Sequence, residues 1–119
     1  MKQRTWTWLP YNPISMENRK YIREIVIPNG VVEISDDAFS HCENIKEIHL
    51  PESITTIGDF AFYNCKRLKR INIPKRVKYV GTYAFAYCKN LKEILFEDID
   101  NIEFGEKVFE DCDNLEINT

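Results

Sequence analysis

The chain repeats itself every 23 residues, and this periodicity constrains its fold more than any other feature of the sequence. The dipeptides Ile27-Pro28, Leu50-Pro51 and Ile73-Pro74 recur at this interval. An Ala-Phe pair and a cysteine recur in the same register, at Ala38-Phe39, Ala61-Phe62, Ala84-Phe85, Cys42, Cys65 and Cys88. A fourth copy is shifted by one inserted residue and carries Glu97 in place of the proline. One such unit cannot bury its own apolar residues, so the units are expected to stack as coils that share one core.

Each coil is expected to contain one main strand. In the third coil, residues 71–73 alternate Ile-Asn-Ile, a period of two that predicts a β-strand with both isoleucines facing inward. Pro74 ends this strand because proline has no N–H to donate to a neighbour. Strands from successive coils would then pair into a parallel sheet. A second short strand is expected over residues 77–80.

The return segment of the coil is expected to be a helical turn. In the third coil this turn would span residues 82–88 and bury Ala84, Phe85 and Cys88. Just before this segment the later coils carry Gly58, Gly81 and Gly105, which predicts either a positive φ or a close approach of two backbones.

The repeat resembles the BspA-like leucine-rich repeats, whose unit reads roughly LxxIxIPxxVxxIGxxAFxxCxxL. The third coil carries that pattern at Leu68, Ile71-Asn72-Ile73-Pro74, Val77, Val80-Gly81, Ala84-Phe85, Cys88 and Leu91. The resemblance covers residues 22 to about 115. It implies an α/β-type solenoid with a parallel sheet on one face and short helical turns on the other. It also implies adhesion to host or extracellular proteins, because members of this family are often large microbial surface proteins.

The repeat divides the chain into two parts. Residues 1–21 do not fit the pattern and are predicted to form an N-terminal cap, in which Trp6, Trp8 and Leu9 cover the first coil. Residues 22–119 are predicted to form a solenoid of about four coils with no clear C-terminal cap. The last coil is therefore expected to continue in a longer chain, to be shielded by another molecule such as a second copy, or to cover itself with its acidic residues. No signal peptide is expected from the first residues and no apolar run reaches the ~18 residues that a membrane span requires, which leaves the cytoplasm or, if a signal peptide has been removed by processing, the microbial cell surface as expected locations.

The four cysteines are predicted to be buried free thiols. With one cysteine per coil, Cys42 and Cys112 would lie ~14 Å apart along the stacking axis, which excludes a four-thiolate zinc site. A disulfide between adjacent coils is the alternative. His41 precedes Cys42, but adjacent residues of a turn point in different directions and do not form a catalytic pair. No catalytic residue, metal or cofactor is expected, and the protein is predicted not to be an enzyme.

Charge is distributed unevenly along the chain. Every charged residue from 66 to 92 is basic, whereas every charged residue from 97 to 116 except Lys107 is acidic. One cationic column follows the repeat register at Arg23, Lys46, Lys69 and Lys92. This basic surface either binds an anionic partner or is simply a solvated face. The net charge of −3 argues against a general nucleic-acid coat protein.

Candidate partner-binding residues come from three columns. The first is the cationic column, in which Arg70 extends the rung at Lys69. The second is the outer sheet column, which includes His49 near Glu47. The third is the aromatic pair just before the Ala-Phe dipeptides, whose rings either bind a partner or pack over neighbouring coils. The predicted binding residues are His49, Phe60, Lys69, Arg70, Asn72, Tyr83 and Lys92.

Three functions remain open from the sequence. The first hypothesis is a non-enzymatic protein–protein interaction module that binds through its repeat surface. The second is a binder of an anionic polymer, such as nucleic acid or a sulfated glycan, through the basic third coil. The third is a structural fragment of a longer adhesin-like protein. Self-association through the uncapped end is a further expectation.

Overall fold

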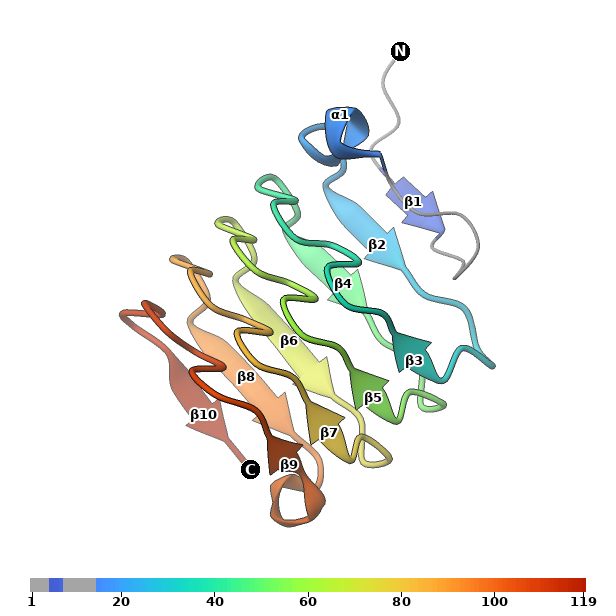
Figure 1. Ribbon diagram of the computed structural model, residues 1–119, viewed down its shortest axis with the longest axis vertical. Helices are drawn as coiled ribbons and strands as arrows, with labels where there is room; N and C mark the ends of the chain where they lie inside the picture. The colour runs from blue at the N-terminus through green and yellow to red at the C-terminus, as the bar shows by residue number, and fades with distance from the viewer. Residues whose placement is uncertain (1–4, 8–14) are drawn as a thin grey trace.

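The chain folds as a parallel β-solenoid of about four coils (Figure 1). The computed structural model describes residues 5–7 and 15–119. One series of strands lies along one side of the molecule, with one strand per coil: β1 (Thr5–Thr7), β2 (Glu24–Val26), β4 (Glu47–His49), β6 (Arg70–Ile73), β8 (Glu93–Phe96) and β10 (Glu116–Asn118). A second series lies opposite: β3 (Glu33–Ile34), β5 (Thr56–Ile57), β7 (Tyr79–Val80) and β9 (Glu103–Phe104). The remaining elements are the helix α1 (Met16–Arg19) and a 3-10 turn, Ile99–Asn101.

Successive coils pair in the register that the repeat predicts. All pairs are parallel, and Ile71 of β6 lies opposite Ile94 of β8, 23 residues later. Both isoleucines of β6 are buried, whereas Asn72 between them is exposed, as the alternation predicts. The predicted stacking of about four parallel coils is thereby confirmed.

The first strand series is divided, which the sequence analysis did not predict. Strands β1, β2 and β4 form one sheet, and β6, β8 and β10 form another. Within the described residues no ladder joins β4 to β6. The second series is continuous from β3 to β9. The second and third coils are therefore joined by strand pairing on one side of the molecule only.

The predicted helical turn at residues 82–88 is wrong. This segment is a series of tight turns, because Tyr83 and Tyr87 have φ values of 56° and 60°. An α-helix of L-residues does not pass through the left-handed region. Alternate N–H groups of this face donate to the neighbouring coil, as where the N–H of Phe62 donates to the carbonyl oxygen of Ala84 at 2.8 Å, and the N–H groups between them close tight turns within their own coil.

The core consists of side-chain columns that run along the stacking axis. Phe39, Phe62, Phe85 and Phe109 form one column, with successive ring centroids 5.5, 5.2 and 5.9 Å apart. This column gives the core a continuous aromatic spine.

The cysteines form a second column of free thiols, as predicted. Three of the four are fully buried, and Cys112 is half-buried. The Cys88 Sγ donates to the carbonyl oxygen of Phe62 in the preceding coil at 3.2 Å. Burial raises the pKa of Cys42 to about 12, so this thiol stays protonated at neutral pH.

A buried arginine ties the N-terminal segment to the first coil. Arg19, the last residue of α1, donates from Nη1 to the carbonyl oxygens of Asp37 and Ser40 at 3.0 and 2.6 Å. Strand β1 extends the sheet beyond β2 and places Trp6 opposite Ile25. The predicted cover by the side chains of Trp6, Trp8 and Leu9 lies outside what the structure describes, and the division at residue 21 stays a prediction. Neither helical element of the described chain is long enough to cross a bilayer.

Candidate partner-binding surface

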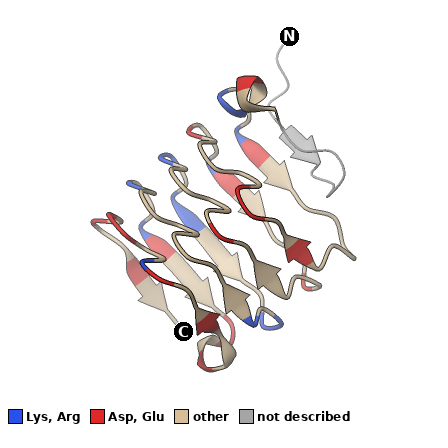
Figure 2. Cartoon of the chain, viewed as in Figure 1, with Lys and Arg blue, Asp and Glu red and all other residues tan. Residues whose placement is uncertain are grey.

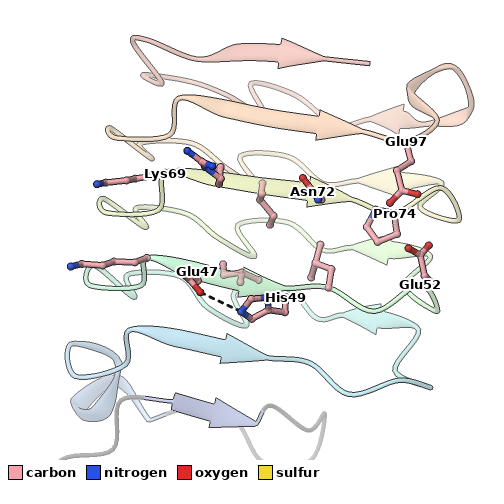
Figure 3. Close-up of a pocket in the computed structure, with 12 residues that line it drawn as sticks. Glu47, His49, Glu52, Lys69, Asn72, Pro74 and Glu97 are labelled. Carbon is pink, nitrogen blue, oxygen red and sulfur yellow. Dashed lines mark ion pairs between the residues drawn. The ribbon is translucent and has the colours of Figure 1, made fainter.

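A groove of about 590 Å³ lies on the outer face of the first strand series, where β4 and β6 are not paired (Figure 3). The side chains of Ile48 and Ile71 point into the core, so these two residues line the groove with their backbone. Leu50 and Pro74 add apolar surface near the carboxyl ends of the strands. The groove thus combines two neighbouring strand edges that form no ladder with each other and a small apolar area.

The two ends of the groove carry opposite charge. Lys46, Lys69 and Arg70 lie where the strands begin, together with Glu47, so this end has a net positive charge. Glu52 and Glu97 lie beyond the other end of the strands, and Figure 3 shows both beside Pro74. A ligand that lies along the strands would therefore meet a basic end and an acidic end.

His49 lies between these two ends, in contact with two carboxylates. Its Nε2 is 3.5 Å from Oε2 of Glu47 on the same strand and 2.9 Å from Oε2 of Glu24 on β2. The predicted position of His49, facing outward near Glu47, is confirmed. The contact with Glu24 was missed, although the 23-residue register already pairs Glu24 with Glu47 and Val26 with His49.

The structure brings together four of the predicted binding residues and separates the other three. His49, Lys69, Arg70 and Asn72 line the groove. Lys92 lies just before β8, one rung beyond the groove lining. The remaining two, Phe60 and Tyr83, lie on the face of tight turns.

Phe60 and Tyr83 pack against each other across two coils. Their ring centroids are 5.2 Å apart with the planes only 14° from parallel, and both residues are half-buried. Tyr63 and Tyr87 extend the group, with ring centroids 5.4 Å apart. These rings therefore cover neighbouring coils and still present an aromatic surface to solvent.

Two groove residues, Glu52 and Glu97, were missed by the sequence analysis. Glu97 occupies the position at which earlier coils have proline, so its departure from the repeat was a signal that could have identified it. For Glu52 the sequence offers no comparable signal.

The charge asymmetry of the sequence persists in three dimensions. Figure 2 shows acidic residues along the last coil and basic residues at the turns of the middle coils. The Nζ of Lys66, one member of the basic group, lies 3.4 Å from Oε1 of Glu43 in the preceding coil, which reduces the local positive charge.

The last coil has a second, apolar hollow of about 290 Å³. Its lining includes Phe96, Phe104 and Ile117, and the latter two are partly exposed. The predicted self-association through this end stays a prediction.

Comparison with known proteins identifies the fold family. Residues 15–119 match the model of the BspA type leucine rich repeat region, six copies. The chain belongs to the BspA-type leucine-rich repeat family. This BspA-type family is generally non-catalytic, and no enzyme family is among the matches. No curated protein matches the chain.

Solved structures of leucine-rich repeat proteins are similar to this BspA-type chain. A leucine-rich repeat protein from Bacteroides ovatus has a TM-score of 0.77 and 28% identity over 84% of this chain and 26% of its own. A leucine rich cell surface protein from Faecalibacterium prausnitzii has a TM-score of 0.65 and 33% identity over 68% of this chain and 21% of its own. The T. pallidum leucine rich repeat protein has a TM-score of 0.77 and 25% identity over 82% of this chain and 46% of its own. The chain thus spans less than half the length of each of these proteins.

Proposed function

We propose that this BspA-type solenoid is a non-enzymatic protein-binding module, and that the groove between β4 and β6 receives an extended segment of a partner protein. The observation that carries this proposal is the coincidence of unpaired strand edges, apolar surface and opposite charges in one groove. Backbone groups at such edges give an extended peptide hydrogen-bond partners, and charges at the two ends fix its direction. The likeness to a cell surface protein supports a binding role.

The acidic residues of the groove favour a protein partner over an anionic polymer. Glu47, Glu52 and Glu97 share the groove with its basic residues. A polyanion lying along the strands would meet repulsion at the acidic end, whereas a peptide can carry a charge of each sign.

A random peptide library displayed on phage tests the proposal directly. Selected peptides are expected to carry an acidic residue and a basic residue about five positions apart, one for each charged end of the groove. An extended stretch of about five residues spans roughly 17 Å at ~3.3 Å per residue. Binding of a selected peptide is expected to fall in Lys69→Glu/Arg70→Glu and to persist in Lys75→Glu/Lys78→Glu. This second variant makes the same charge change at exposed positions of the third coil outside the groove.

The other outcomes separate the remaining hypotheses. Loss of peptide binding in Phe60→Ala/Tyr83→Ala alone would move the site to the aromatic face. Equal loss in both charge-reversal variants, with strong weakening by salt, would favour the anionic-polymer hypothesis. Failure to select any peptide would contradict the proposal and favour a structural spacer.

A further inference from the structure

Two carboxylates and one imidazole converge on the outer face of the first sheet. Glu24 lies on β2, and Glu47 and His49 lie on β4. One donor atom from each residue lies within 4.8 Å of the other two, and the two contacts of the His49 Nε2 are 2.9 and 3.5 Å long. Across residues 15–119 no other group of three His, Cys, Asp or Glu side chains comes this close together.

The backbone ladder between β2 and β4 sets this arrangement. The parallel register places Glu24 opposite Glu47 and Val26 opposite His49. Glu47 and His49 are two residues apart on one strand, so their side chains project from the same face. The three donors therefore stand on hydrogen-bonded strands, which fix a site more accurately than loops do.

The donor atoms match the requirements of a transition metal. Imidazole nitrogen suits zinc, copper, iron and nickel, whereas magnesium and calcium prefer oxygen ligands and more of them. With metal–ligand bonds of about 2.1 Å, the ligand atoms of a tetrahedral site lie about 3.4 Å apart. The contacts of His49 lie on either side of that separation, so small side-chain rotations bring the ligands into place. Two carboxylates also balance the charge of a divalent ion.

We propose that Glu24, Glu47 and His49 form a surface site for a divalent transition metal ion, zinc above all. Three protein ligands leave at least one coordination position for water or another donor. Glu47 and His49 also line the groove, so this position is adjacent to it. Arg70 lies in the same groove and limits the affinity, because a cation must bind beside a positive charge. The site needs no partner protein and is tested on this chain alone.

The two histidines of the chain make the test direct. Untagged protein is titrated with zinc chloride while the imidazole signals of His49 and His41 are followed by NMR. His41 is the built-in control, since its Nδ1 lies 3.0 Å from the Nδ2 of Asn64, away from the cluster. The protein carries Cys112→Ala, which removes the least buried thiol as a competing ligand. A parallel cobalt titration reports any remaining thiolate ligation through its intense charge-transfer absorption.

If the site binds zinc, the imidazole NMR signals of His49 should change in a saturable way during the titration, and those of His41 should not change. Glu24→Gln, Glu47→Gln and His49→Gln are each expected to weaken zinc binding by more than about tenfold, since loss of a mere supporting group already costs 10–100-fold at metal sites. The matched control His41→Gln is expected to leave the affinity unchanged. Circular dichroism and thermal melting confirm that each variant remains folded.

Two results would overturn the proposal. One is the absence of any change in the His49 signals up to millimolar zinc. The other is zinc binding that survives His49→Gln with unchanged affinity, which would place the metal elsewhere on the protein.

Discussion

At the scale of single residues, the glycine column allows the coils to stack closely. Neither Gly58 nor Gly81 has a positive φ, so their role is the close approach of backbones rather than an unusual conformation. A Cβ placed on Gly81 would lie 2.6 Å from the backbone nitrogen of Asp59 in the preceding coil. Only a residue without a side chain fits there.

Gly81→Ala is therefore expected to destabilise the protein. Because the added methyl group meets backbone that cannot move aside, the free energy of unfolding should fall by about 1–3 kcal/mol. Urea denaturation measures the change. Ser35→Ala is the matched control, since the equivalent position of the first coil already carries a Cβ, and its effect should stay within about 0.5 kcal/mol. Equal effects of both variants would contradict the close-packing argument.

The buried thiols make the protein sensitive to alkali. The pKa of Cys42 is raised from 9.0 to about 12, chiefly by burial, with Arg19 acting in the opposite direction. A raised folded-state pKa of this kind stabilises the fold fully below pH 9 and loses its effect as the pH rises towards 12. The urea midpoint is thus expected to fall over that range, and less steeply in Cys42→Ala. Identical slopes for the two proteins would exclude Cys42 as a cause.

At the scale of elements, one prediction failed because of two residues per coil. Phe60 and Asn64 of the second coil have φ values of 59° and 62°, and their equivalents in the other coils have φ values between 51° and 60°. The spacing of Ala61, Phe62 and Cys65 fits a helical turn equally well. Bulky residues such as Phe60 rarely adopt positive φ, so this position gave no signal, whereas His41, Asn64 and Asp111 at the other position are residue types enriched at positive φ. The inward strand positions could be predicted because the alternation of buried and exposed residues is visible within a few consecutive residues.

The same distinction applies to the groove. Its outward residues, such as His49 and Asn72, follow from strand alternation and the repeat register. The division between β4 and β6 does not, because both strands show the same pattern of inward and outward residues. Pairing across coils depends on how whole coils stack, which no single position encodes.

Hydrogen exchange should reveal this division. Amide protons of β4 and β6 that face the groove have no partner in a neighbouring strand, so they should exchange at least about tenfold faster than those of β6 that bond to β8. NMR of individual amides gives the rates. The amides of β5 and β7 are the internal reference, since their ladder is continuous. If the amides on the β4 side of β6 are protected as strongly as those on the β8 side, then β4 and β6 pair in solution.

At the scale of the whole molecule, each coil contacts only its neighbours, so stability accumulates along one axis. Phe62 is fully buried between the rings of Phe39 and Phe85, whereas Phe109 continues the column beyond Phe85 and is only half-buried. A substitution should therefore matter more at Phe62.

Phe62→Ala is expected to lower the free energy of unfolding by about 3–5 kcal/mol, as for a fully buried aromatic residue. Phe109→Ala, the matched change in the last coil, should cost clearly less. Chemical denaturation of both variants provides the comparison. A loss below about 1 kcal/mol for Phe62→Ala would contradict the core assigned here.

The division of one strand series also has a mechanical consequence. Between the second and third coils, strand pairing holds one side of the molecule and is missing on the other. Suppose that force pulls the two termini apart along the stacking axis. Fewer strand-to-strand hydrogen bonds then share the load at this junction than at the junctions on either side of it. In an optical trap this junction is therefore expected to rupture before the junctions on either side of it, and the two halves would swing apart about the seam formed by β5 and β7.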